Sequence, residues 1–284
     1  MSALFFRMIK TSVASVPGQM SALRRREATK GWLFLALALG LALARDAPAQ
    51  TLAPALVAAA ANMQTALTEL VPLFEKEGKG KVSVNIGSSA NLVRQIQQGL
   101  PVELFLSADE DFALKLVDAG LTTDRGVVYA TGRLVLATLK ESPLKLDPQL
   151  AGLKESLNSG ADNGQKFAIA NPELAPYGKA AVQAMQKQGI WSQAQPRLVL
   201  GESLAQTTQY ISTGAAPSGM TALALVLSPA MTERVRYVVV AADLHAPIRQ
   251  RMVLLRTAGP ASRAFYDFLQ SPLAKAVLQR YGYE

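Results

Sequence analysis

Short apolar runs alternate with stretches of helical periodicity along most of the chain after residue 50. The apolar runs predict strands at 53–61, 81–86, 102–108, 132–139, 166–172, 196–201, 233–243 and 249–257. Helical spacing of apolar positions predicts helices at 63–77, 91–99, 109–120, 178–191 and 203–214, with two short helices after residue 261. The run 53–61 is interpreted as a buried strand, although its alanines make strand and helix hard to separate. This alternation predicts an α/β fold with mostly parallel sheets flanked by helices.

The same alternation occurs in both halves of this region, with no tandem repeat and no long linker between them. Two α/β units without a flexible join predict two lobes that are connected by crossing strands and enclose a cleft. We expect the first lobe to comprise residues 50–132 plus 249–284 and the second to comprise residues 133–248. The crossings are expected near Gly132 and His245–Arg249.

The first 49 residues have the pattern of an export signal. A basic stretch around 24–30 precedes the uncharged apolar run 31–44, and Ala47 and Ala49 fit a small-x-small cleavage site. The apolar run is shorter than the roughly 20 residues that span a bilayer, so an uncleaved anchor is the less favoured alternative. The sequence therefore predicts cleavage after Ala49 and a periplasmic location, and translation from Met20 rather than Met1 would give a leader of more ordinary length.

The net charge of +8 is concentrated in the leader. Seven of the 29 basic and two of the 21 acidic residues lie in 1–49, which leaves 22 basic and 19 acidic residues and a net charge of +3. The mature chain therefore shows little sign of nucleic-acid binding. Because the chain has no cysteine, disulfides, thiolate metal sites, catalytic thiols and a lipid anchor on cysteine are all excluded.

The sequence contains no convincing active site. Its one histidine, His245, lacks neighbours at metal-ligand spacing, and there is no G-x-S-x-G, P-loop or G-x-G-x-x-G motif. The three carboxylates within 107–111 suggest a metal site or an acid–base pair, but their place at a helix start favours capping. We expect no enzyme, no cofactor and no separate metal site. An exported hydrolase is the remote alternative, and it requires His245 beside Ser88 or Ser89.

Small or polar residues stand at four predicted strand-to-helix turns. These turns contain Asn62, the segment 87–89, the segment 175–178, and Ser203 with Leu204. Helix N-termini expose backbone N–H groups that bind anions, and the carboxyl ends of strands in an α/β sheet gather at one edge. Each turn alone is consistent with ordinary capping. Together, the four predict a cage of N–H and O–H donors around a small anion.

Four segments resemble the periplasmic molybdate-binding proteins of ABC transporters. They are "AAAANMQTAL", "GSSANLVRQIQQGLPVELFLSAD", "ANPELAPYGKAA" and "AFYDFLQSPLAKAVLQRYGYE", and the resemblance extends from about residue 54 to 283. It implies the two-lobed type II periplasmic binding protein fold, with molybdate or tungstate held in the interlobe cleft by hydroxyls and backbone amides. Molybdenum would then be bound only as the oxyanion. The resemblance also implies a monomer that delivers the oxyanion to an ABC transporter membrane permease.

The resemblance places seven residues at the oxyanion site: Ala61, Asn62, Ser88, Ser89, Ala175, Tyr177 and Leu204. Leu204 is expected to donate its backbone N–H and Tyr177 its hydroxyl. Some relatives use a tyrosine from a later turn, where this chain has Ala222, and some have a hydroxyl where this chain has Ala61. The preference between molybdate and tungstate is therefore left open.

A sulfate or phosphate binder on the same fold is the alternative within this class. A phosphate binder would need a carboxylate to accept a hydrogen bond from a protonated ligand oxygen. In the four turns, only Glu173 or Glu202 could supply one, by turning inward.

Overall fold

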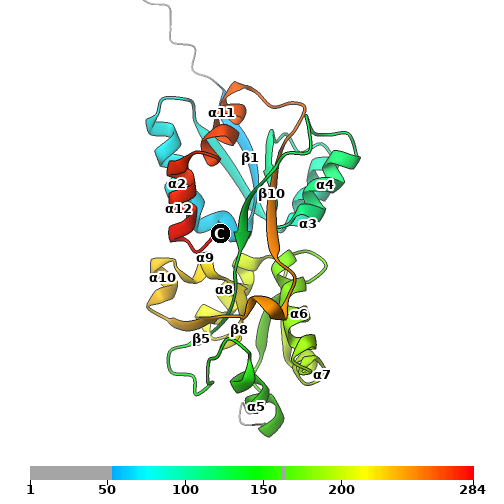
Figure 1. The fold of residues 1–284 in the computed structure, drawn as a ribbon, viewed down its shortest axis with the longest axis vertical. Helices are drawn as coiled ribbons and strands as arrows, with labels where there is room; N and C mark the ends of the chain where they lie inside the picture. The colour runs from blue at the N-terminus through cyan, green and yellow to red at the C-terminus, as the bar shows by residue number, and fades with distance from the viewer. Residues whose placement is uncertain (1–52, 161–163) are drawn as a thin grey trace, which may run out of the picture. The chain divides into compact units, whose positions relative to one another are not determined.

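The computed structural model describes residues 53–160 and 164–284. The predicted leader, residues 1–49, lies outside the described residues. Within the described part of the chain, no helix is long and apolar enough to cross a membrane. The described residues form two five-stranded sheets, each covered by helices on both faces (Figure 1).

The first sheet has the strand order β2-β1-β3-β10-β4. Its strands are β1 (Ala55–Ala60), β2 (Val82–Gly87), β3 (Leu104–Leu106), β4 (Val127–Gly132) and β10 (Ile248–Leu254). Strand β1 pairs in parallel with β2 and β3, whereas β10 runs antiparallel to both β3 and β4. Four of the five strands therefore point the same way. The sheet is mostly parallel, as the sequence predicts.

Alternate residues of the first sheet pack against different helices. The helices are η1 (Ala61–Met63), α2 (Gln64–Lys76), α3 (Ser89–Gln97), α4 (Glu110–Asp118), α11 (Pro260–Leu269) and α12 (Pro272–Arg280). Val57 and Ala59 of β1 pack with α2, α11 and α12, and Ala58 packs with α3 and α4 on the other face. Because successive strand residues point to opposite faces, the apolar run of β1 is buried on both sides.

The second sheet has the order β7-β6-β8-β5-β9 and repeats the pattern of pairings. Its strands are β5 (Leu134–Leu139), β6 (Phe167–Ala170), β7 (Leu198–Gly201), β8 (Ser218–Ala222) and β9 (Val235–Val239). Strand β6 is parallel to β7 and β8, and β5 is antiparallel to β8 and β9. We call each sheet with its helices a lobe, and the two helix-covered, mostly parallel sheets confirm the predicted α/β fold class.

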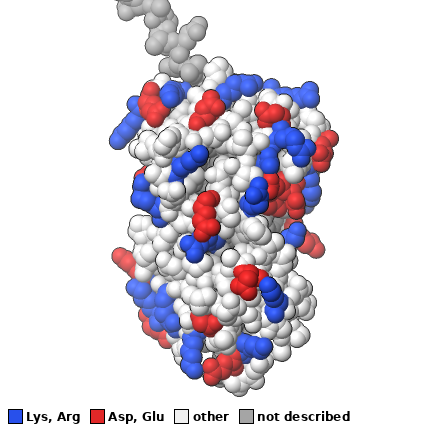
Figure 2. Space-filling model, in the orientation of Figure 1, with Lys and Arg blue, Asp and Glu red and all other residues white. Residues whose placement is uncertain are grey.

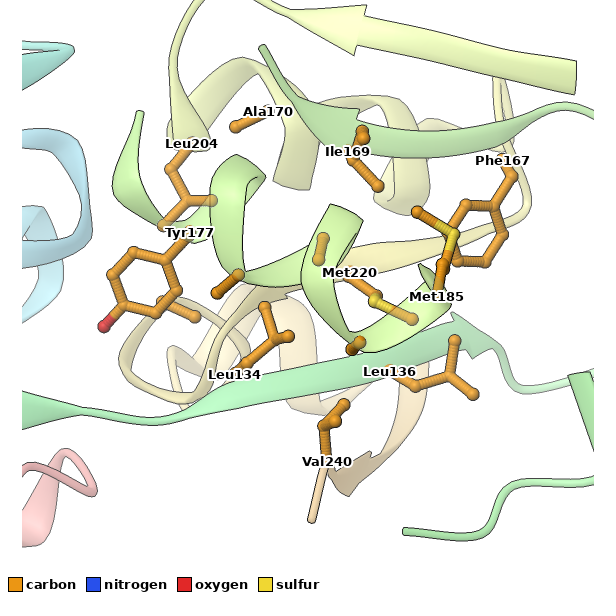
Figure 3. Close-up of a cluster of buried hydrophobic side chains, with 14 of the residues drawn as sticks. Leu134, Leu136, Phe167, Ile169, Ala170, Tyr177, Met185, Leu204, Met220 and Val240 are labelled. Atoms are coloured by element: carbon orange, nitrogen blue, oxygen red, sulfur yellow. The ribbon is translucent and has the colours of Figure 1, made fainter. Parts of the chain in front are cut away.

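Helices also cover both faces of the second sheet. They are α5 (Ala151–Ser159), α6 (Pro176–Lys187), α7 (Trp191–Ala194), η2 (Gln195–Arg197), α8 (Leu204–Thr213), α9 (Leu223–Val226), α10 (Pro229–Thr232) and η3 (Ala242–Leu244). Leu134, Leu136 and Ile169 pack against α5 and α6, and the alternate residues Val135 and Ala168 pack against α8 and α9. Tyr177 stands at one end of the first of these clusters, with its hydroxyl turned away from the apolar side chains (Figure 3).

The chain passes between the lobes at two places. Strand β4 ends at Gly132 and β5 begins at Leu134, so the predicted strand 132–139 is divided between two sheets. The return passage follows β9 and η3 and enters β10 at Ile248 (Figure 1). Strand β10 thus carries residues from late in the sequence into the middle of the first sheet. Strands β4 and β8 were not predicted from the sequence, and nor were the short helices α7, α9 and α10.

Candidate ligand-binding site

A small cavity lies where the carboxyl ends of parallel strands from both lobes face one another. Its volume is about 10 Å³, which is about the space that one water molecule needs. Its lining is Ala60, Ala61, Asn62, Gly87, Ser88, Ser89, Ala108, Ala175, Pro176, Tyr177 and Leu204. The structure therefore brings all seven sequence-predicted site residues together. None of the lining side chains carries a formal charge.

Three helices begin at the cavity. Helix α3 begins at Ser89, α6 at Pro176 and α8 at Leu204, and the residue before each has extended backbone. The first N–H groups of a helix have no partner within that helix, and they carry its partial positive charge. The helix starts therefore make the cavity electropositive, although no cationic side chain lines it.

The two serines of the β2–α3 turn offer hydroxyl groups to the cavity. Ser88 is 4% exposed, and its Oγ is the one buried side-chain nitrogen or oxygen of the described residues that has no hydrogen-bond partner. Ser89 Oγ accepts a hydrogen bond from the Ala108 backbone N–H at 3.1 Å, which leaves the hydroxyl hydrogen of Ser89 available. Buried polar groups are normally paired, so an orphaned hydroxyl at a cavity indicates a ligand that completes its bonding.

Tyr177 offers a third hydroxyl, from the first turn of α6. Its neighbour Gly178 lets α6 approach the end of β6, because a Cβ there would lie 2.1 Å from the Ala170 carbonyl oxygen. Burial raises the pKa of the Tyr177 hydroxyl well above its ordinary value of 10, and the nearby Tyr283 raises it further. The phenol therefore keeps its proton at neutral pH and can act as a donor.

Asn62 uses its side chain to fix the site rather than to face the cavity. Its amide nitrogen donates to Gln250 Oε1 at 2.9 Å and to the Tyr283 hydroxyl at 3.0 Å, so both amide hydrogens are engaged. The Tyr283 hydroxyl in turn donates to the Asn62 carbonyl oxygen at 2.8 Å. What Asn62 can still offer a ligand is its backbone N–H near the start of the helical segment.

Three buried polar residues around the cavity were missed from the sequence: Tyr129, Gln250 and Tyr283. Tyr283 lies in the "RYGYE" segment that carries the family resemblance, but nothing local in the sequence ties it to Asn62. Gln250 stands between Arg249 and Arg251 in β10, so nothing in its local sequence marks it as the buried residue of the three. The lobes also touch directly beside the cavity, where the Ala90 N–H donates to the Leu174 carbonyl oxygen at 3.2 Å.

The other sequence-based candidates lie away from the cavity lining. Asp109 caps α4 by accepting from the Phe112 N–H at 2.9 Å, which confirms capping for the acidic segment 107–111. His245 Nδ1 contacts the Ala246 carbonyl oxygen at 2.8 Å, the Ser88 hydroxyl has no partner among the described residues, and Ser89 Oγ pairs with the Ala108 N–H, so the hydrolase arrangement is not formed. Glu173 and Glu202 are both exposed and do not line the cavity.

Charged side chains of both signs are interspersed over the outer surface of the lobes, as Figure 2 shows for one face (Figure 2). No broad patch of a single sign occurs on that face. The contrast with the uncharged cavity lining is clear, since the lining contains only apolar, hydroxyl and amide side chains.

Comparison with known proteins gives consistent matches over the described region. The family model of bacterial extracellular solute-binding proteins matches residues 55–284. The molybdate-binding protein ModA of Rhodobacter capsulatus is 36% identical over 256 residues, covering 89% of this chain and 95% of that protein. ModA of Azotobacter vinelandii is 37% identical over 230 residues, covering 80% and 88%.

A solved structure agrees with these sequence matches. The periplasmic molybdate-binding protein of Azotobacter vinelandii matches with a TM-score of 0.71 and 31% sequence identity, covering 80% of this chain and 97% of that chain. The match confirms the two-lobed fold that the sequence resemblance implies. The chain therefore belongs to the family of bacterial extracellular solute-binding proteins and is a relative of the molybdate-binding proteins within it.

Proposed function

We propose that this chain is a periplasmic solute-binding protein that captures molybdate, and tungstate as its close analogue, and delivers it to the permease of an ABC transporter. The observation that carries the proposal is the buried, unpartnered Ser88 hydroxyl in a cavity without charged groups. Molybdate is proposed as the ligand because the relatives with 36% and 37% sequence identity are molybdate-binding proteins.

The donor chemistry of the cavity fits a fully deprotonated oxyanion. A buried dianion is stable only when its oxygens accept a full set of hydrogen bonds, and bonds to a charged group contribute about 1.5–3 kcal/mol each. In the proposed site, Ser88, Ser89 and Tyr177 donate hydroxyl hydrogens. Backbone N–H groups of Ala61, Asn62 and Leu204 complete the cage. The Ala175 N–H donates to the Asn171 carbonyl oxygen at 2.9 Å, so the neighbouring Tyr177 N–H takes its place in the third turn.

Release and capture would then depend on movement of the lobes. We assign residues 50–132 with 249–284 to one lobe and 133–248 to the other, with the hinge at the two crossings. The ligand favours the closed arrangement because only there do donors from both lobes reach it. In this proposal the chain acts as a monomer without enzymatic activity, and residues 1–49 are the leader that is removed on export.

Sulfate and phosphate are the competing ligands on this fold. Phosphate at neutral pH retains a proton and needs an acceptor, and no carboxylate lines the cavity. Sulfate is fully deprotonated but smaller than molybdate, so it would leave some of the donors out of reach. Selection of molybdate and tungstate over sulfate would then rest on the size of the closed cage and the reach of its donors.

Isothermal titration of the purified protein with molybdate, tungstate, sulfate and phosphate tests the proposal. We expect one-to-one binding of molybdate and tungstate and much weaker binding of the other two. Thr138→Val is a suitable control, because Thr138 Oγ1 is buried in the second lobe, bonds to the Pro217 carbonyl oxygen and does not line the cavity. A preference for sulfate or phosphate would change the proposed ligand, and no binding of any oxyanion would refute the anion site.

A further inference from the structure

Five polar side chains form a continuous hydrogen-bonded chain beside the cavity, which we call the buried polar network. Its members are Asn62, Tyr129, Tyr177, Gln250 and Tyr283. They come from η1, β4, α6, β10 and the segment after α12, and all are buried. Burying polar groups costs desolvation free energy, and this cost is offset only when each donor and acceptor of the network has a hydrogen-bond partner.

Gln250 occupies the centre of this network. Its Oε1 accepts from Asn62 Nδ2 at 2.9 Å and from the Tyr129 hydroxyl at 2.9 Å. The other acceptor near the Tyr129 hydroxyl, the Ser107 carbonyl oxygen, lies farther away at 3.3 Å. Asn62 is held in turn by Tyr283, as described above. Two donors on Oε1 fix the orientation of the Gln250 amide, and its Nε2 must then face the opposite direction.

The Gln250 Nε2 group points toward Tyr177. Gln250 Nε2 donates to the Tyr177 hydroxyl oxygen at 3.1 Å, and this is the one hydrogen bond of that oxygen within residues 53–160 and 164–284. A phenol has one hydrogen, and because its oxygen is already accepting from Gln250, the hydrogen is left for another acceptor. The Tyr177 side chain lines the cavity, where the bound anion would supply that acceptor.

Gly132 leaves room for the Gln250–Tyr177 pair because it has no side chain. A Cβ on Gly132 would lie 2.0 Å from Tyr177 Oη and 2.5 Å from Gln250 Nε2. Gly132 ends β4 at the first crossing between the lobes, whereas Tyr177 belongs to α6 of the second lobe and Gln250 to β10 of the first. The Gln250–Tyr177 bond therefore joins the two lobes at the cavity wall.

We propose that Gln250 is a positioning residue that makes the Tyr177 hydroxyl a donor to the bound oxyanion. The inference rests on the proposed function, because it concerns the same site. Gln250 does not line the cavity, and it acts through Tyr177. Since the bond crosses between the lobes, Tyr177 is oriented for donation only when the lobes are together.

A double-mutant cycle on molybdate affinity tests this role. We expect Gln250→Met to weaken binding about tenfold in the unmodified background and to have almost no further effect in Tyr177→Phe. Gln250→Glu is expected to weaken binding more than Gln250→Met, because a carboxylate accepts the phenol hydrogen and repels the anion. If Gln250→Met does not fold, the excess of the loss caused by Gln250→Glu in the unmodified background over its loss in Tyr177→Phe measures the part of the effect that passes through Tyr177.

Thr138→Val is the matched control, since it removes a buried side-chain hydrogen bond remote from the cavity and is expected to change thermal stability without changing affinity. Losses that add independently in the Gln250→Met, Tyr177→Phe double variant would overturn the positioning role. So would a Tyr177→Phe variant with unchanged affinity. If the unmodified protein binds no molybdate, the proposed function falls as well, which distinguishes the two failures.

Discussion

The Ser89 hydroxyl oxygen accepts a hydrogen bond from the Ala108 backbone N–H at 3.1 Å, which links the start of α3 to the end of β3. The neighbouring Ser88 hydroxyl has no such partner among the described residues. The two adjacent serines of this turn therefore differ in whether their hydroxyl has a partner within the protein. The Ser89 hydroxyl both supports the fold and faces the cavity, while the Ser88 hydroxyl has no partner among the described residues and is available to a ligand.

This difference predicts separable effects for the two serine-to-alanine variants. Ser88→Ala should weaken molybdate binding by about 1–3 kcal/mol and leave the free energy of unfolding of the ligand-free protein unchanged or slightly raised. Ser89→Ala should weaken binding by a similar amount and also destabilise the ligand-free protein, because the buried Ala108 N–H loses its acceptor. Titration calorimetry and denaturant unfolding measure the two quantities.

Ser212→Ala is the control for this pair, since Ser212 is a partly exposed residue of α8 whose hydroxyl donates to the Gln209 carbonyl oxygen and which does not line the cavity. It should change neither quantity. Equal destabilisation by Ser88→Ala and Ser89→Ala would show that Ser88 has a structural partner after all.

Tyr177→Phe should weaken molybdate binding by about 1–3 kcal/mol, because one donor to the dianion is lost. Burial raises the pKa of the Tyr177 hydroxyl well above 10, so this hydroxyl stays protonated across the neutral and mildly alkaline range. Molybdate affinity of the unmodified protein should therefore be constant between about pH 7 and 9. A steep fall within that range, absent from Tyr177→Phe, would contradict the assigned protonation state.

Gly132→Ala, a substitution at the first crossing between the lobes, should disturb the binding site. The added methyl group would overlap the Tyr177 hydroxyl and the Gln250 amide, which are held on several sides and cannot both move away. We expect this overpacking to lower the free energy of unfolding by about 1–3 kcal/mol and to weaken molybdate binding. Gly259→Ala is the matched control, because a Cβ there meets its nearest atom at an ordinary 3.5 Å. Equal behaviour of the two variants would rule out the close approach at Gly132.

Glu110 of α4 is clamped to β10, and this predicts a pH dependence of stability. Its carboxylate lies 2.6 Å from Arg251 Nη2 and 2.6 Å from Arg249 Nε. Hydrogen bonds first from Arg251 and then from Arg249 hold the pKa of Glu110 below its ordinary value of 4.5. The folded state therefore binds this proton less readily than the unfolded state, so the stabilisation is present above about pH 4.5 and is lost as the pH falls through the lower, folded-state pKa.

The measurement is the difference in unfolding free energy between the unmodified protein and Glu110→Gln at several pH values. It should be under about 1 kcal/mol near pH 6, since the group is partly exposed, and should shrink toward acidic pH. Glu155→Gln provides the comparison, because Glu155 forms a single exposed ion pair with Lys145. A difference that grows as the pH falls would reverse the assigned direction of the shift.

Much of this molecule could be predicted from short-range features of the sequence. Apolar alternation and helical spacing act over a few residues, so they predicted most strands and helices to within a few positions. The four turns were predicted as donors because a helix start exposes its N–H groups whatever lies around it, and Asp109 was predicted as a cap for the same local reason. The family resemblance then linked the turns to a single site.

Only the tertiary structure decided how these parts meet. Nothing in the local sequence of β10 indicates that it runs antiparallel between β3 and β4, or that Gln250 lies beside Asn62, 188 residues earlier. The orphaned state of Ser88 and the engaged state of the Asn62 amide are likewise properties of neighbours brought from elsewhere in the chain. Periodicity and capping depend on contacts within one or two turns, whereas hydrogen-bond direction at a buried site depends on which distant segments pack there.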